Sequence, residues 1–334
     1  MDDYVAPVWL RNGHLMTFYA AVRRRDFRGL PEPEKRLFTV APDARVLAKC
    51  HWQPDPPEHP TLVLLHGLEG SANAPYMKGL AIRAMRAGFN VVRLNQRNCG
   101  RTEHLSTTLY HSGLSGDPAA VIEELAEHDG LGSIAVIGYS LGGNLALRMA
   151  GVYGEAAPPA LGAVCAVSPP IDLARAADEI ERLPNAIYQR NFLRDLKARL
   201  RRKAALFPGR YPVEGLGRIR TIREFDNRYT APHFGFRDAA DYYRRASALG
   251  VADRIRVPTL IISASDDPFI PVAPLADPAV AGNPRIRVVV TRWGGHCGFI
   301  ERSAAGPDGD RYWAERQAVG FAQTHARADQ GRAC

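Results

Sequence analysis

The 334-residue chain contains no hydrophobic run long enough to cross a membrane. A transmembrane helix needs about 18 or more apolar residues in succession, so the sequence predicts none. The first residues, MDDYVAPVWLRNGH, begin with acidic side chains and lack the apolar core of a secretory signal. We therefore expect a cytoplasmic protein. Hydrophobic residues make up 46% of the chain, a share that excludes intrinsic disorder and collagen-like repeats.

Cysteine is scarce, and charge of one sign is only mildly in excess. The five cysteines are odd in number, widely spaced and without a C-x-x-C pair: Cys50, Cys99, Cys165, Cys297 and Cys334. This argues against a disulfide framework or a structural zinc site. Lys and Arg number 43 against 35 acidic residues, and this excess is spread along the chain. Without a basic stripe or a recognition motif, we expect no nucleic-acid partner.

What the sequence does contain is a regular alternation of strand-like and helical patterns. Continuous apolar runs are typical of parallel strands that are covered on both faces, and segments with apolar residues at helical spacing lie between them. The alternation predicts an α/β fold with a mostly parallel sheet flanked by helices. Strands are expected at residues 36–52 (two short strands around a Pro-Asp turn), 61–67, 89–95, 133–140, 162–170, 257–267 and 285–296, and helices at 75–88, 117–129, 141–151 and 310–326.

The alternation stops between residues 171 and 250, a segment that is mostly helical, polar and rich in arginine. We interpret it as a helical cap inserted over the carboxyl ends of the strands, where ligands bind in open α/β sheets. The expected organisation is therefore a core in two parts, residues 1–170 and 251–334, interrupted by a cap at 171–250.

The motif with the clearest chemistry is Gly138-Tyr139-Ser140-Leu141-Gly142, which lies between an apolar strand and a helix. This is the context of a nucleophile elbow, a tight turn that exposes a serine hydroxyl above the edge of a sheet. Residues two before and two after the serine must be small, and glycine has no Cβ to clash. Ser140 is therefore the predicted nucleophile.

A serine hydroxyl needs a general base, and elbow proteins supply the remaining residues in the order Ser, acid, His. Asp266 and Asp267 lie at the end of the strand-like run LIISASDD, before a loop that contains proline. We select Asp267 and keep Asp266 as the alternative. His296 follows the last expected strand, between Gly294-Gly295 and Gly298, and it is the predicted base.

The segment His66-Gly67-Leu68-Glu69-Gly70-Ser71 follows the strand that precedes the first core helix. In elbow proteins this loop gives one N–H of the oxyanion hole, and the residue after the nucleophile gives the other. We assign the backbone N–H groups of Leu68 and Leu141. For His66 we favour a structural role in this loop, and for Glu69 a solvated position over one lining the pocket.

These motifs together resemble the α/β-hydrolase superfamily, and more narrowly the YheT-like hydrolases. That family is related to medium-chain ester synthase/esterases and to abhydrolase-domain lipases. The resemblance runs nearly end to end, with Met16 and Asn98 where the family usually has glutamine and glycine. It rests on the segments GYSLGGN, HGLEGS, ASDDPF, GGHCGF, RNGHLMT, LNQRNCG, LYHSG, SPPIDL and REFDNRYTAPHFGFRDAADYYRRAS.

The resemblance implies an α/β-hydrolase fold and a serine hydrolase acting on a small-molecule carboxylic ester. Short- or medium-chain acyl esters are expected, and monoacylglycerols are included. The triad chemistry needs no metal and no organic cofactor. Acyl transfer to an alcohol (ester synthase) and thioester hydrolysis use the same triad and stay open as alternatives. A further alternative is not an enzyme at all: a catalytically silent binding module built on a hydrolase fold.

A basic amphipathic segment lies inside the expected cap. Arg199, Arg201, Arg202 and Lys203 follow several apolar residues at helical spacing. Such a segment is compatible with weak contact to an anionic membrane surface. We favour the alternative, a cap helix with one solvated face and one apolar face over the pocket.

Overall fold

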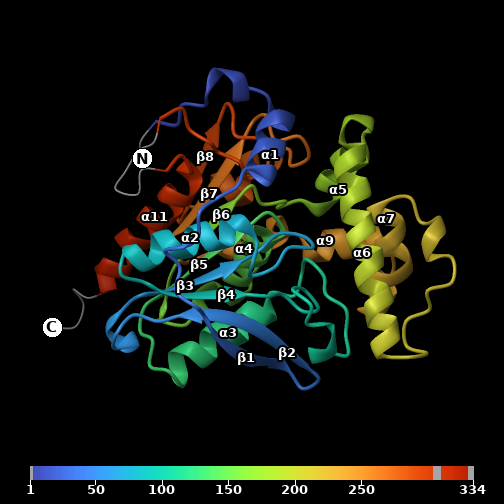
Figure 1. Cartoon of the computed structure of the whole chain (residues 1–334), viewed down its shortest axis with the longest axis horizontal. Helices are drawn as coiled ribbons and strands as arrows, with labels where there is room; N and C mark the ends of the chain where they lie inside the picture. The colour runs from blue at the N-terminus through green and yellow to red at the C-terminus, as the bar shows by residue number, and fades with distance from the viewer. Residues whose placement is uncertain (1–2, 304–309, 330–334) are drawn as a thin grey trace.

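The computed structural model describes residues 3–303 and 310–329, so Cys334 lies outside the described residues. Eight strands form one sheet in the order β1-β2-β4-β3-β5-β6-β7-β8 (Figure 1). The strands are β1 Glu34–Ala41, β2 Ala44–His51, β3 Thr61–Leu65, β4 Asn90–Leu94, β5 Ile134–Tyr139, β6 Leu161–Val167, β7 Thr259–Ala264 and β8 Ile286–Thr291. The α-helices are α1 Gly13–Val22, α2 Pro75–Arg86, α3 Gly116–Glu127, α4 Leu141–Tyr153, α5 Leu173–Glu181, α6 Ala186–Leu206, α7 Ile222–Phe225, α8 Ala231–His233, α9 Ala239–Ala246, α10 Pro278–Ala281 and α11 Trp313–Asp329.

The prediction of a mostly parallel sheet is confirmed. β4, β3, β5, β6, β7 and β8 pair in parallel, whereas β1 and β2 form an antiparallel hairpin that joins the sheet beside β4. Every residue of β3, β4, β5 and β7 is buried. Helices cover both faces of these strands, which is why their sequences are mostly apolar, although β4 also buries Asn90 and Arg93.

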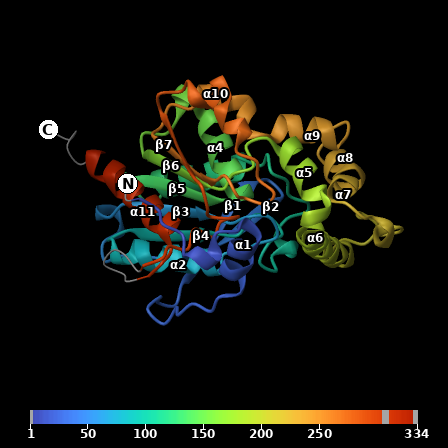
Figure 2. The ribbon, with the colours of Figure 1, turned by 90° about the horizontal axis from the view of Figure 1, so that it is seen from above.

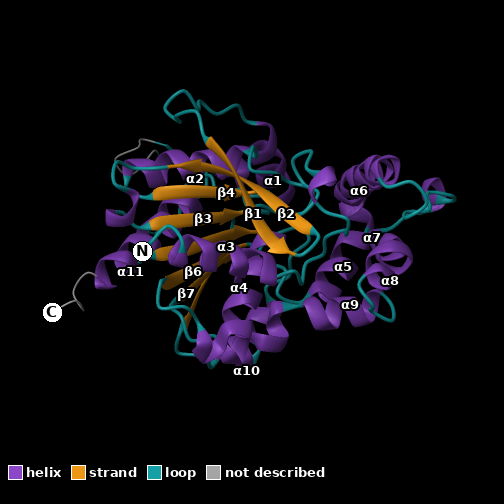
Figure 3. Ribbon diagram, turned by 90° about the horizontal axis from the view of Figure 1, so that it is seen from below, coloured by secondary structure: helices purple, strands orange, loops and turns teal. Residues whose placement is uncertain are grey.

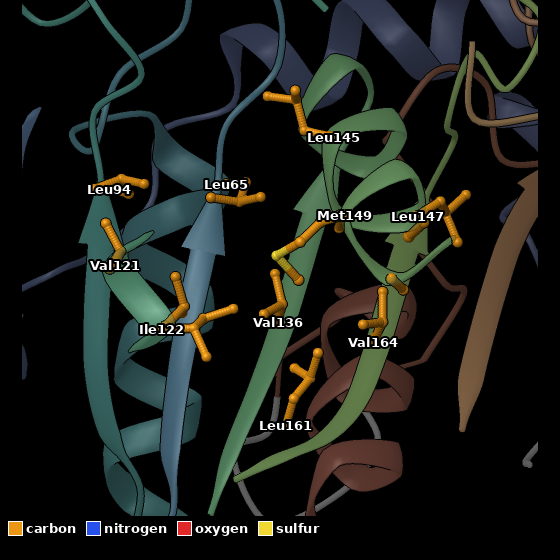
Figure 4. Close-up of a cluster of buried hydrophobic side chains, with 14 of the residues drawn as sticks. Leu65, Leu94, Val121, Ile122, Val136, Leu145, Leu147, Met149, Leu161 and Val164 are labelled. Carbon is orange, nitrogen blue, oxygen red and sulfur yellow. The ribbon is translucent and has the colours of Figure 1, made fainter. Parts of the chain in front are cut away.

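Helices cover both faces of the sheet (Figure 2). α2 and α11 pack on one face, where Leu80 of α2 and Trp313 of α11 belong to one buried cluster. α3 and α4 pack on the other face, over a second cluster shown in Figure 4. There Val121 of α3 and Met149 of α4 lie against side chains from β3, β5 and β6. These two apolar layers hold the sheet in place and so fix the ends of its strands.

Between β6 and β7 the chain forms helices α5 to α9, which gather at one end of the molecule (Figures 1 and 3). Part of this group has an apolar cluster of its own, in which Leu196 and Leu200 of α6 pack against Phe225 and Tyr229. In this fully described stretch the interruption of the strand–helix alternation is therefore a set of packed helices. Among the described residues, no helix is long and apolar enough to cross a membrane.

On α6 the apolar residues Phe192 and Leu196 line a pocket, as expected, but the structure corrects the expectation that all four basic residues of this segment are solvated. Arg201 is exposed on α6, but Arg199 is only 6% exposed and Lys203 is fully buried. Lys203 donates to Asn98 Oδ1 at 2.6 Å and to the carbonyl of Glu103 at 2.8 Å. Two of the four basic side chains therefore join α6 to the core and do not lie on its solvated face.

The sequence also gave no indication of α1. Its N-cap is Asn12, whose side chain accepts a hydrogen bond from the backbone N–H of Leu15. Asparagine favours this position because it satisfies one of the unpaired N–H groups at a helix start. The helix exposes apolar residues such as Phe18 on its outer side. Its sequence therefore lacks the separation into an apolar and a polar face by which an amphipathic helix is recognised.

Candidate active site

Ser140 occupies the turn between β5 and α4. Its backbone has φ +52° and ψ −122°, a conformation that L-residues adopt only under strain and that clusters at functional sites. The turn leaves no room for side chains at the flanking glycines. A Cβ on Gly138 would lie 2.1 Å from the carbonyl oxygen of Gly142, and a Cβ on Gly142 would lie 2.4 Å from that of Leu65. The glycines are thus required by the closeness of the strand and helix backbones.

The three residues selected from the sequence for acid, base and nucleophile meet at this turn. His296 Nε2 lies 2.9 Å from Ser140 Oγ, and His296 Nδ1 lies 2.8 Å from Asp267 Oδ2. The carboxylate of Asp267 is 2% exposed and the imidazole is 10% exposed. An imidazole that bridges a buried carboxylate and a serine hydroxyl can remove the proton of that hydroxyl.

The two adjacent acids have different partners. Asp267 Oδ1 accepts hydrogen bonds from the backbone N–H groups of Phe269 and Ile270, which leaves Oδ2 for His296. Asp266 Oδ1 instead accepts from the backbone N–H of Gly295 at 2.9 Å. Asp266 therefore holds the turn that precedes the histidine, while Asp267 contacts the histidine itself.

The loop that carries His296 is held by α1, a contact that sequence reasoning missed. The backbone N–H of His296 donates to Thr17 Oγ1 at 2.8 Å. Gly13 packs so closely that a Cβ there would lie 1.7 Å from the carbonyl oxygen of Asp266. The only signal in the sequence was the resemblance of the segment around Gly13 to a family signature, because no local pattern links residues 13–17 to residue 296.

Two opposing effects act on the protonation of His296. Burial favours the neutral imidazole and lowers its pKa, whereas the neighbouring Cys297 and the carboxylate of Asp267 raise it. The net direction of the pKa is upward from the usual histidine value, because the interactions with Cys297 and with the Asp267 carboxylate, including the Nδ1–H···Oδ2 hydrogen bond, together outweigh burial. The site can therefore hold the proton that is taken from Ser140.

The two residues whose backbone N–H groups we assign to an oxyanion hole, Leu68 and Leu141, come from the loop after β3 and from the start of α4. Leu141 is the first residue of α4, so its N–H has no acceptor within the helix. We call residues 66–71 the oxyanion loop. A Cβ on Gly67 would lie 3.1 Å from Ser140 Cβ, which places this loop directly against the nucleophile. Leu68 and Leu141 both line the pocket that contains Ser140.

The oxyanion loop is fixed by buried polar groups. The backbone N–H of Gly67 donates to Tyr76 Oη at 2.9 Å, and that of Glu69 donates to Tyr110 Oη at 3.1 Å. His66 is fully buried, and its Nε2 accepts from the backbone N–H of Gln96. Burial lowers the pKa of His66 to about 4, so this imidazole is a neutral structural group, as we favoured from the sequence.

The expectation of a solvated Glu69 is wrong. Its carboxylate is 8% exposed and pairs with the buried guanidinium of Arg199 on α6 at 2.5 Å. Residues 69 and 199 are far apart in the sequence, so no local pattern could have indicated the pair.

The pocket above Ser140 is lined mainly by apolar side chains from the helices between β6 and β7 and from the loop after β7. The only acidic side chain in its lining, within the described residues, is Asp226, which accepts from the hydroxyls of Thr230 and Tyr243. Burial raises the pKa of Asp226 to about 6. The apolar lining comprises Leu68, Leu141, Pro170, Leu173, Ala176, Ala177, Ile180, Phe192, Leu196, Ile222, Phe269 and Ile270.

Within residues 3–303 and 310–329, no group of three or more His, Cys, Asp or Glu side chains is arranged to hold a metal ion. The groups that the described residues bring together at the site are a serine hydroxyl, an imidazole, a carboxylate and backbone N–H groups.

Comparison with known proteins places the chain in a family. The family model of the alpha/beta hydrolase fold matches residues 60–303. The chain is 34% identical over 331 residues to YheT of Escherichia coli (strain K12), a candidate esterase, with 98% of this chain and 94% of that protein aligned.

Two relatives from Saccharomyces cerevisiae are more distant. The medium-chain fatty acid ethyl ester synthase/esterase 2 is 29% identical over 268 residues, which cover 73% of this chain and 58% of that protein. The monoacylglycerol lipase is 28% identical over 280 residues, which cover 79% and 61%.

Solved structures share the fold. The esterase Pf2001 of Pyrococcus furiosus superposes with a TM-score of 0.59 at 17% identity, over 91% of this chain and 97% of that one. Est1E from Butyrivibrio proteoclasticus superposes with a TM-score of 0.54 at 13% identity, over 88% and 99%. With the strand–elbow–helix geometry and the match over residues 60–303, the chain belongs to the α/β-hydrolase family, and it is similar to YheT over almost its whole length.

Proposed function

We propose that this protein is a serine hydrolase that cleaves carboxylic esters through an acyl-enzyme on Ser140. The observation that carries the proposal is the continuous hydrogen-bonded chain from Ser140 Oγ through His296 to Asp267. Membership of the α/β-hydrolase family supports it, as do relatives that are named as an ester synthase/esterase and a lipase.

The hydrogen-bonded geometry supports the following sequence of steps. Ser140 Oγ attacks the ester carbonyl while His296 Nε2 takes the hydroxyl proton, and Asp267 stabilises the imidazolium. The N–H groups of Leu68 and Leu141 stabilise the oxyanion of the tetrahedral intermediate. His296 then donates its proton to the leaving alcohol, which leaves the acyl group on Ser140. A water molecule that His296 deprotonates attacks the acyl-enzyme and releases the acid.

The pocket favours an apolar acyl or alkyl group. Its walls are aliphatic and aromatic side chains, and Phe269 lies against the His296 ring with centroids 4.2 Å apart. We propose short- to medium-chain acyl esters as the substrate class, with monoacylglycerols included. We also propose that residues 171–250 act as a cap, because α5, α6 and α9 supply much of the pocket lining.

A second candidate function is acyl transfer to an alcohol in place of water. A relative that is named as an ethyl ester synthase/esterase favours it, and the same acyl-enzyme serves both reactions. The test is the partition of products when ethanol is added to an ester substrate. Ethyl ester formed in excess of the free acid would support transfer, and free acid alone would support hydrolysis.

The decisive experiment combines a fluorophosphonate probe with the Ser140→Ala variant. We expect the probe to label the wild-type protein at Ser140, and the variant to lose roughly a million-fold in turnover of p-nitrophenyl esters. Circular dichroism should show an unchanged fold. A protein whose Ser140 is not labelled, or a variant that keeps more than a few per cent of the activity, would instead support a binding module on a hydrolase fold.

A further inference from the structure

Arg199 joins the pocket helix α6 to the oxyanion loop. Its guanidinium lies 2.5 Å from Glu69 Oε1, and both side chains are less than 10% exposed. The same guanidinium stacks over the ring of Tyr110 at 4.1 Å. Arg199 also lines the pocket with Ser140. Arg199 therefore contacts the oxyanion loop on one side and the pocket above Ser140 on the other.

Glu69 is held in a conformation that the chain would not choose by itself. Its φ is +54°, a left-handed value that strains the backbone of a residue with a Cβ. Tyr110 Oη accepts the Glu69 N–H and donates to Glu69 Oε1 at 3.0 Å. The ion pair and the tyrosine thus fix both the backbone and the side chain of the residue that follows Leu68.

We infer that Arg199 is a positioning residue, which acts through Glu69 to aim the Leu68 N–H at the oxyanion. The inference rests on the proposed function, since it assumes a tetrahedral intermediate at Ser140. Its physical reason is the steep dependence of oxyanion stabilisation on donor geometry, where a displacement of about 1 Å costs as much as a hundredfold in rate. The helix that lines the pocket and the loop that binds the oxyanion then form one rigid unit.

The first test compares two arginines of α6. Arg199→Met removes the ion pair with Glu69. Arg202→Met is the matched control, because Arg202 pairs with Glu103 at 2.6 Å and does not line the pocket. We expect Arg199→Met to lower kcat by about tenfold to a hundredfold with little change in KM, and Arg202→Met to leave kcat as in the wild type.

A readout that is specific to the oxyanion separates positioning from a structural role. Affinity for a boronic acid, which forms a tetrahedral adduct on serine, should fall by the same factor as kcat/KM in Arg199→Met. Affinity for the product acid should stay unchanged. A rise in KM alone, an unchanged kcat, or an equal loss in Arg202→Met would overturn the inference.

Arg199→Met leaves the Glu69 carboxylate buried without its partner, which is costly enough to endanger folding. Two further variants test the same inference if Arg199→Met does not fold. Tyr110→Phe removes the hydroxyl that binds the backbone of Glu69, and it should lower kcat with the same signature. The double variant Arg199→Met/Glu69→Gln removes both charges, and it should fold while kcat stays low. A double variant with wild-type kcat would contradict a positioning role.

The two proposals fail differently. If Ser140→Ala keeps its activity, the proposed function is wrong whatever the arginine variants do. If Ser140→Ala is inactive and Arg199→Met turns over like the wild type, only the positioning role is wrong.

Discussion

At the scale of single residues, the site depends on which oxygen of which acid faces His296. Asp267 uses one oxygen for two backbone N–H groups and the other for the imidazole. Asp266 faces the turn at Gly295 instead. Asp266 lies in a turn that follows β7, closed by the hydrogen bond from the Asp267 N–H to the carbonyl of Ala264, and proline at position 268 disfavours a helical conformation for Asp267. The two acids therefore cannot exchange roles.

The Asp267→Asn variant should lose far more activity than Asp266→Asn. An amide at position 267 can present its NH₂ group to the imidazole and favour the wrong tautomer, a change that costs about ten-thousand-fold in a serine protease. The kcat of both variants on one water-soluble ester gives the comparison, with circular dichroism as the folding control. A large loss of kcat in Asp266→Asn together with a near-normal kcat in Asp267→Asn would show that Asp266, and not Asp267, is the acid that acts on His296.

The pH dependence of the reaction should follow His296. Only the neutral imidazole accepts the proton of Ser140, so kcat/KM falls as the pH drops through the pKa of this group. Because the pKa of His296 is raised, the acid limb should lie above the ordinary histidine value of about 6.5. Asp267→Asn should move the limb to lower pH, since it removes the charge that stabilises the imidazolium. A wild-type limb at or below that ordinary value would contradict this electrostatic description.

At the scale of elements, α6 is one of the helices through which residues 171–250 contact the rest of the molecule. Its apolar side chains Phe192 and Leu196 line the pocket, while Lys203 is anchored to the loop after β4. Ile187 is 63% exposed on the same helix. The same helix therefore has some residues that line the pocket, one that binds the core and one that faces solvent. Single substitutions can test each of these roles separately.

Substitutions at the pocket positions of α6 should change selectivity among acyl chains. Phe192→Ala or Leu196→Ala enlarges the pocket, so the ratio of kcat/KM for long over short p-nitrophenyl esters should rise. Ile187→Ala is the matched control, with an expected ratio equal to that of the wild type. Activity that changes by the same factor on every chain length would count against a role of this helix in specificity.

α1 supports the histidine loop from the other end of the chain. Gly13→Ala would place a Cβ 1.7 Å from the Asp266 carbonyl oxygen, so α1 or the loop must shift. We expect lower resistance to urea and a large loss of kcat, because Thr17 then no longer holds the backbone of His296. Gly320→Ala on α11, where a Cβ would meet nothing within 4 Å, should instead stabilise the protein by about 0.5–1 kcal/mol. Equal urea midpoints for the two variants would contradict this packing argument.

At the scale of the whole molecule, two apolar layers hold the sheet, and the three residues of the candidate site lie beyond the carboxyl ends of its strands. Ser140 follows β5, Asp267 follows β7 and His296 follows β8. These strands are neighbours or near neighbours in the order β5-β6-β7-β8. Parallel pairing places their carboxyl ends at one edge, and residues separated by 156 positions thereby come within hydrogen-bond distance.

The sequence by itself determined the sheet, the elbow and the three residues that meet there. Each has a local cause: strands covered on both faces are mostly apolar, and the elbow needs glycine where the strand and helix backbones touch. The tertiary structure alone decided that Glu69 and Arg199 form a buried pair and that Thr17 holds His296. Whether a polar side chain is buried depends on which distant segment covers it. The local sequence around a charged residue looks the same whether that residue is solvated or paired in the interior.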